Sequence, residues 1–127
     1  MNPRWLDYGF IFATIALTVY GQLILKWRMD QVGPLPPGIA GGLRHLLGML
    51  IDPAVVSSFA AAFLASLAWM AAMTRFELSY AYPFMSLNFV VVLVLSVAFL
   101  GETLTLSKGL GVALIVLGTL VASARTS

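Results

Sequence analysis

The stretch SYAYPFMSLNFVVVLVLSVAFL, residues 79–100, decides the fold class, because it carries no charged side chain from its first position to its last. A helix of about 20 mainly apolar residues is long enough to cross the hydrocarbon core of a bilayer. Three other stretches of similar length are also mainly apolar: Trp5 to Leu25, Ala54 to Met73 and Leu104 to Ala124. The sequence therefore predicts an all-α membrane protein with four transmembrane helices.

The composition of the 127-residue chain agrees with that fold class. Hydrophobic residues make up 61% of the chain, charged residues make up 9%, and the formal net charge is +2. A soluble domain carries roughly 25% charged residues, because its surface faces water. This composition excludes an ordinary soluble enzyme, a disordered chain and a nucleic-acid-binding protein.

Few residues in this chain are suited to metal binding or catalysis. The chain has no cysteine and one histidine, which excludes a disulfide framework, a thiolate metal site and a multi-histidine metal site. No phosphate-binding loop, serine elbow or pair of catalytic carboxylates is present. We therefore expect no enzymatic activity, no metal and no cofactor.

The segment between the first and second spans predicts a short helix on the membrane surface. The prolines in VGPLPPG, residues 32–38, end the first helix because each lacks a backbone donor. The stretch from Ile39 to Ile51 is too short to span a bilayer, and it carries leucines at helical spacing: Leu43, Leu46, Leu47 and Leu50. This pattern indicates an interfacial amphipathic helix. The alternative is an extension of the second span, broken at Asp52 and Pro53.

The basic residues divide almost evenly between the two sides of the membrane. Four spans place both termini on one side, with Arg4, Arg75 and Arg125, and leave Lys26, Arg28, Arg44 and Lys108 on the other. Orientation in the membrane normally follows an excess of basic residues on the cytoplasmic side. The chain therefore either inserts in both orientations or has its orientation fixed by a partner, and we expect a dimer.

Polar residues in the first span form one stripe. Thr14, Thr18, Gln22 and Lys26 recur every four residues, which places them on one helical face. The functional interpretation is a polar groove from mid-membrane to the headgroups, where Lys26 and Arg28 hold a phosphate. The alternative is hydrogen bonding between helices by the two threonines and Gln22, with a lysine that reaches to the membrane surface.

The start of the third span is predicted to be kinked. Pro83 cannot donate a hydrogen bond to the carbonyl of Ser79, and its ring opens that turn of the helix. The freed carbonyl then needs another partner, because the hydrocarbon core offers no water.

Four polar residues surround this kink. Tyr82 and Ser86 lie one turn apart on one face and are candidate substrate contacts, whereas Asn88 lies off that face and is expected to bond another helix. Tyr80 and Tyr82 are interpreted either as substrate contacts or as part of the aromatic belt at the membrane surface.

The fourth span carries a stripe of small residues. Gly111 and Gly118 are seven positions apart, and small residues on one stripe let helix backbones approach closely. We interpret this face as a dimer contact. Thr103 or Ser107 is expected to cap the start of the helix, and Glu102 lies beside its positive end.

These features resemble the small four-helix members of the drug/metabolite transporter superfamily. The resemblance covers nearly the whole chain and includes GQLILK at 21–26, GET at 101–103 and the glycines of the fourth span. The stretch AYPFMSLNFV, residues 81–90, resembles the signature of the small subunits of the aminoarabinose-phosphoundecaprenol flippase. The resemblance implies one four-helix transporter domain over residues 1–127, located in the bacterial inner membrane.

The resemblance also implies a function. That flippase family moves a polyprenyl-phosphate-linked sugar across the inner membrane for lipid A modification, as a homodimer or with a homologous small subunit. If this function applies, we expect the polar residues of the first and third spans to contact the lipid: Thr18, Gln22, Lys26, Arg28, Tyr80, Tyr82 and Ser86. The small multidrug resistance proteins are similar in build, and in them the fourth helix forms the dimer contact. They carry a glutamate eight residues before the lysine, whereas this chain has Thr18 there.

Two other functions remain open at this point. One is export of a small metabolite or drug, although no span carries a carboxylate at its middle that could bind a cationic substrate. The other is a membrane subunit that transports nothing and supports a glycosyltransferase.

Overall fold

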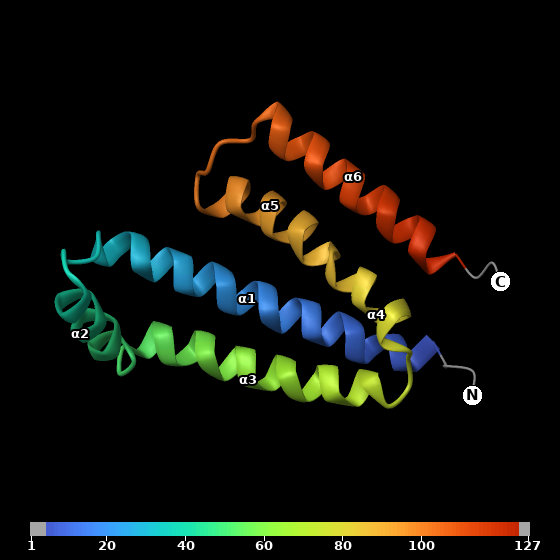
Figure 1. Ribbon diagram of the computed structural model, residues 1–127, viewed down its shortest axis with the longest axis horizontal. Coiled ribbons are helices and arrows are strands. Elements are labelled where there is room, and N and C mark those ends of the chain that lie inside the picture. The colour runs from blue at the N-terminus through green and yellow to red at the C-terminus, as the bar shows by residue number, and fades with distance from the viewer. Residues whose placement is uncertain (1–4, 125–127) are drawn as a thin grey trace.

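A computed structural model describes residues 5–124, and within that range the chain is helical and has no strand (Figure 1). After a 3-10 turn at Trp5–Asp7 the helices are α1 (Tyr8–Val32), α2 (Ile39–Met49), α3 (Pro53–Met73), α4 (Leu78–Met85), α5 (Leu87–Phe99) and α6 (Leu106–Ser123). Four segments are long and apolar enough to cross a membrane: Trp5–Val32, Pro53–Met73, Leu78–Phe99 and Leu106–Ser123. The predicted four-span, all-α fold is confirmed.

The short helix between the first two spans is separate from α3. Asp52 ends the turn after α2, and its Oδ1 accepts hydrogen bonds from the backbone nitrogens of Ala54 at 3.0 Å and Val55 at 3.4 Å. Pro53 occupies the first position of α3, where its missing donor costs nothing. The leucines of α2 remain exposed, as expected of a helix whose apolar face contacts lipid: Leu43, Leu46 and Leu47.

The first helix continues beyond the predicted end at Leu25. Residues 26–32 contain neither proline nor glycine, and the Lys26 ammonium lies 2.9 Å from the Asp30 carboxylate one turn later. Such i,i+4 pairs support helical structure. The helix ends where Gly33 adopts a positive φ of 94°, a conformation that glycine adopts without strain.

The last helix begins later than the sequence predicts, at Leu106 instead of Leu104. Thr105 caps it, since its Oγ1 accepts a hydrogen bond of 3.2 Å from the backbone nitrogen of Lys108. The expectation that Thr103 or Ser107 provides this cap is therefore wrong.

The third span is interrupted at Ser86, three residues after Pro83, and this break separates α4 from α5. The chain crosses the break through two short-range hydrogen bonds of 3.0 Å, from Ser86 N to the Pro83 carbonyl and from Phe89 N to the Ser86 carbonyl. The Thr119 hydroxyl of α6 also lies 3.1 Å from the Pro83 carbonyl and 2.9 Å from the Ile115 carbonyl. A side chain of a neighbouring helix thus donates a hydrogen bond to the backbone beside the break.

Helices α1 and α3 pack along each other, and α6 packs on α4 and α5. The α1–α3 contact is close at Gly21, where an added Cβ would lie 3.0 Å from the Ser58 carbonyl oxygen. Helix α1 begins and α6 ends at one end of the bundle, while α2 and the α5–α6 loop lie at the other (Figure 1).

We predict that Gly21→Leu destabilises the protein by about 1–3 kcal/mol, because the side chain overfills the α1–α3 contact. Gly9→Leu is the matched control on the same helix, since nothing lies within 4 Å of a Cβ there. Thermal unfolding in detergent measures both. Equal melting temperatures for the two variants would show that the close approach at Gly21 is unimportant.

We predict that Asp52 stabilises the α2–α3 turn through two separable interactions, an ion pair and a helix cap. Its Oδ2 accepts a 2.9 Å hydrogen bond from Arg28 Nε, and its Oδ1 caps α3. Asp52→Asn keeps a capping oxygen and loses the ion pair, whereas Asp52→Ala loses both. We therefore expect melting temperatures at neutral pH to fall in the order wild type, Asp52→Asn, Asp52→Ala.

The same carboxylate gives this prediction a pH dependence. Partial burial acts to raise the pKa of Asp52, but the hydrogen bonds from Arg28, Val55 and Ala54 and the charge of Arg28 together lower it below 3.8. The stabilisation is therefore complete above pH 3.8 and is lost as the pH falls through the lower, folded-state pKa. The difference between wild type and Asp52→Asn should shrink over that acidic range, and a constant difference would contradict the assignment.

Candidate functional site

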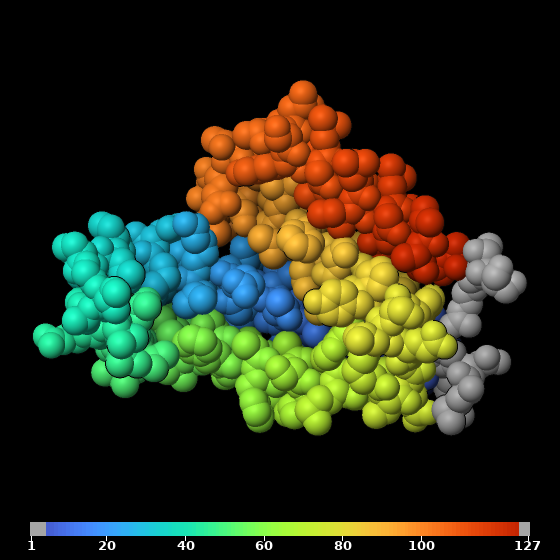
Figure 2. Space-filling view, in the orientation of Figure 1, coloured from blue at the N-terminus to red at the C-terminus, as the bar shows by residue number. Residues whose placement is uncertain are grey.

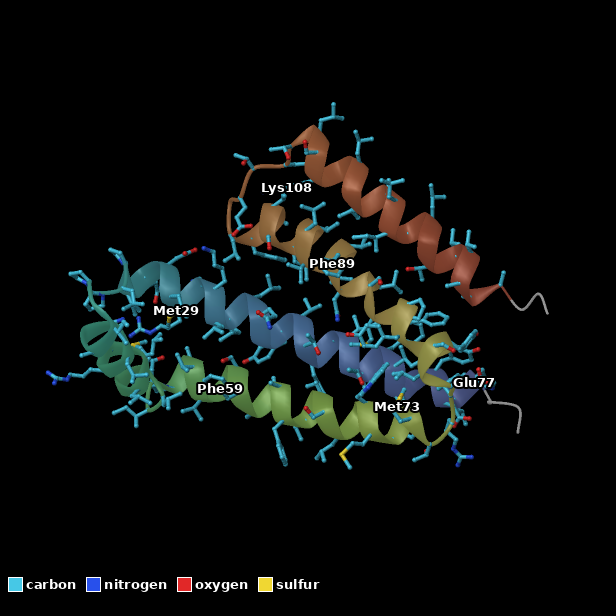
Figure 3. The ribbon with its side chains drawn as sticks, in the orientation of Figure 1. Met29, Phe59, Met73, Glu77, Phe89 and Lys108 are labelled. Carbon is cyan, nitrogen blue, oxygen red and sulfur yellow. The ribbon has the colours of Figure 1, made fainter. Side chains whose placement is uncertain are left out.

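A groove of about 860 Å³ lies between α1, α3 and the broken α4–α5 span. Figure 2 shows it as a hollow with α1 recessed between α3 and α5, and Figure 3 labels Phe59 and Phe89 on the two facing walls. Its lining includes Thr14, Thr18, Gly21, Gln22, Leu25, Ser58, Ser66, Trp69, Met70, Tyr82, Met85, Ser86, Asn88 and Val92. We call this hollow the α1–α3–α5 groove.

The lining of the groove is mainly apolar, and its polar side chains are uncharged. It holds hydroxyl and carboxamide side chains, and none of the described residues that line it is charged at neutral pH. Several hydroxyls donate to their own helix, as Thr14 does to the Phe10 carbonyl at 2.7 Å and Ser66 to the Ala62 carbonyl at 3.1 Å. Their oxygens keep lone pairs that can accept from a ligand. The groove therefore suits a neutral or weakly cationic polar group better than an anion.

Four of the predicted site residues line this groove: Thr18, Gln22, Tyr82 and Ser86. The sequence places the groove between the first and third spans, and the structure adds α3 as a third wall. Ser58, Ser66 and Trp69 on that wall were missed. The pattern in the sequence that points to this wall is the recurrence of small residues at helical spacing, which leaves room beside the helix: Ser58, Ala62, Ala65 and Ser66.

The two tyrosines of the third span lie in different places. Tyr82 is 63% exposed and its ring meets Trp69 edge-on, with centroids 6.1 Å apart. Tyr80 instead shares a 2.8 Å hydrogen bond with the Tyr8 hydroxyl and packs against Phe76 and Phe84. Tyr80 therefore belongs to an aromatic cluster between α1 and α4, outside the groove lining.

The two basic residues predicted to hold a phosphate lie beyond the groove. Lys26 pairs with Asp30, and both side chains are about half exposed, while Arg28 is bound to Asp52. At about 1.5 Å per residue, the 28 residues of the first span measure about 42 Å, against about 30 Å for the hydrocarbon core. Lys26 and Arg28 therefore reach the headgroup level at the α2 end.

The side chain of Asn88 lies in a different environment from the predicted one. Instead of bonding another helix, its side chain lines the groove, and its Oδ1 is buried without a hydrogen-bond partner among the described residues. A buried acceptor without a partner is costly, which makes this oxygen the most unusual polar atom of the site.

The structure locates the glycines of the predicted dimer face and one of the basic residues used to predict the topology. Gly111 and Gly118 lie on the exposed side of α6, where nothing approaches within 4 Å of an added Cβ. Arg75 lies 3.7 Å from Asp7, just before the start of α1, whereas Lys26 pairs with Asp30 near the other end of that helix, so the two lie at opposite ends as the sequence predicts. Arg4 and Arg125 lie outside the described residues.

Comparisons with known proteins extend this picture. The EamA-like transporter family matches residues 6–124. The "probable 4-amino-4-deoxy-L-arabinose-phosphoundecaprenol flippase subunit ArnF" of Pseudomonas fluorescens is 32% identical, over 94% of this chain and 90% of its own length. Proteins of the same name from Sodalis glossinidius and Pseudomonas aeruginosa are 34% and 33% identical, over 91% and 88% of this chain and 89% and 80% of their own lengths.

No solved structure matches the chain. The family match covers every membrane-spanning helix, and the relatives align along almost their whole length. This multi-pass membrane protein therefore belongs to the EamA-like transporter family, as its four spans and its signature in the third span led us to expect.

Proposed function

We propose that this chain is a subunit of a flippase that moves a polyprenyl-phosphate-linked sugar, such as 4-amino-4-deoxy-L-arabinose-phosphoundecaprenol, across the bacterial inner membrane. Relatives that align along almost the entire chain bear the name of such a subunit. The observation that carries the proposal is the set of uncharged polar side chains that line the largely apolar α1–α3–α5 groove.

The groove lowers the main energetic barrier to moving such a lipid, which is the transfer of its sugar through hydrocarbon. A sugar in hydrocarbon leaves its hydroxyls without hydrogen-bond partners, and each such group costs several kcal/mol. Side chains such as Thr18, Gln22 and Ser86 supply partners along the path. The polyprenyl tail is as apolar as the bilayer and stays in lipid beside the helices, so the groove encloses the headgroup alone.

The phosphate is bound at the α2 end of the groove by Lys26. The Lys26–Asp30 ion pair is exposed, and exposed pairs contribute little to stability, so a phosphate can replace the Asp30 carboxylate. Arg28 is less available, because it is held 2.9 Å from the more buried carboxylate of Asp52. We therefore assign phosphate contact to Lys26 and a structural role to Arg28.

The energy for transport comes from the substrate gradient in this proposal. The membrane-spanning residues that line the groove include no carboxylate, and a deep acid is the usual site of proton or sodium coupling. Consumption of the sugar lipid on the far side of the membrane keeps its gradient steep.

The working unit is a dimer, with a second copy or a homologous small subunit. The relatives are named as subunits, and four thin helices leave the groove open on one side. Gly111 and Gly118 lie on the free side of α6, where their lack of a side chain permits close contact with another helix.

We predict that Lys26→Ala raises the KM for the sugar lipid about tenfold, because one charge-assisted hydrogen bond to the phosphate is lost. The assay uses proteoliposomes that contain the protein and its partner subunit, and a membrane-impermeant amine reagent counts the sugar amines on the outer face. Lys108→Ala is the matched control, since Lys108 has the same charge and lies at the same end but donates to the Thr103 carbonyl. Equal KM values for the two variants would disprove the role of Lys26, and a wild type that flips nothing would disprove the proposed function.

We predict that Gly118→Leu weakens subunit association without unfolding the chain. The added side chain meets open space within the monomer, so the free energy of unfolding should stay within about 0.5 kcal/mol of the wild-type value. Native mass spectrometry of gently extracted protein then counts the subunits. Undiminished dimer in Gly118→Leu and Gly111→Leu alike would place the interface elsewhere.

A further inference from the structure

The buried oxygen of Asn88 is the one polar atom of the groove lining that is found to be buried and without a partner among the described residues. This oxygen has almost no accessible surface, so it gains a hydrogen bond when a donor enters the groove and the carboxamide turns toward that donor. We propose that Asn88 determines substrate specificity by accepting a hydrogen bond from a donor on the sugar headgroup. This inference rests on the proposed function and identifies the residue that recognises the sugar.

The backbone around Asn88 holds this acceptor in place. Asn88 lies in the first turn of α5, two residues after the break at Ser86, and the Thr119 hydroxyl links the break to α6 through the Pro83 carbonyl. Broken membrane helices are common where transporters bind polar substrates, because the irregular backbone lines a cavity. The position of the carboxamide thus follows from the helix break itself.

An aromatic pair complements the carboxamide in the same groove. The Trp69 and Tyr82 rings meet edge-on at 6.1 Å, and both residues contribute to the lining. A sugar ring has an apolar face of C–H groups and an edge of hydroxyl and amine donors. Aromatic rings pack on that face, and a carboxamide oxygen accepts from that edge.

The absence of charge among the described lining residues narrows the substrate class further. A protonated sugar amine finds no carboxylate in this groove, so its partners are the Asn88 oxygen and the aromatic faces, which attract cations. A bare phosphate offers no donor to Asn88 when ionised. The groove therefore selects a headgroup that carries a sugar with donors over the unglycosylated polyprenyl phosphate.

The experiment compares Asn88→Leu with Asn88→Asp in the complex with the partner subunit. Short-chain analogues of the substrate compete for transport of the amino-sugar lipid in proteoliposomes, and calorimetry measures their binding to the purified complex. The analogues carry the amino sugar, the same sugar with a hydroxyl in place of the amine, or phosphate alone. Ser96→Ala is the control, because Ser96 is buried on the same helix outside the groove lining.

We expect Asn88→Leu to weaken binding of the amino-sugar analogue about tenfold, to nearly the level of phosphate alone, whereas Asn88→Asp keeps an acceptor and retains the preference for sugar over phosphate. A loss limited to the amino analogue identifies the amine as the donor, and an equal loss for both sugars identifies a hydroxyl. Asn88→Leu should melt no lower than wild type, because it removes an acceptor that has no partner. A purely structural role would lower the melting temperature instead.

The outcomes separate this inference from the proposed function. If the wild type flips the lipid but Asn88→Leu binds all three analogues as the wild type does, the assignment of Asn88 is overturned. If the wild type flips nothing but binds the sugar analogues through Asn88, transport alone is disproved. If the wild type neither flips the lipid nor prefers sugar over phosphate, both are wrong.

Discussion

The constraint behind this structure is that every backbone hydrogen-bonding group inside a membrane needs a partner from the protein. Unbroken helices meet it along α1, α3 and α6, whereas the third span contains Pro83 and is interrupted at Ser86. The chain responds with two short-range bonds across the break and with the Thr119 hydroxyl of a neighbouring helix. The break is thus stabilised by α6, and it lies beside the α1–α3–α5 groove.

The groove and the break depend on each other. A continuous third helix would turn its residues steadily around one axis, whereas the interruption at Ser86 brings Tyr82, Ser86 and Asn88 to a single cavity although the last lies off the face of the others. On the opposite wall, the close contact at Gly21 holds α1 against α3 and keeps their polar residues aligned. Positions of hydrophilic groups in the apolar bundle therefore follow from backbone geometry.

Much of the fold was predictable, because apolar length and proline placement are strong local signals. The four spans, the separate short helix and the polar stripe of the first span all follow from the sequence. The extension of α1 to Val32 was missed because the apolar stretch ends at Leu25 and the helix continues through polar residues such as Lys26 and Asp30. The cap at Thr105 was missed because three polar residues compete for that position. The third wall of the groove and the unpartnered oxygen of Asn88 arise only from packing between helices distant in the chain.

The unequal lengths of the outer helices bear on the surrounding membrane. At about 1.5 Å per residue, α6 with its 18 residues measures about 27 Å, whereas the first span measures about 42 Å. A long helix tilts in a bilayer and a short one draws the two leaflets together, each at a modest cost per ångström of mismatch. The shorter span therefore favours a thinner bilayer beside α6 than beside α1.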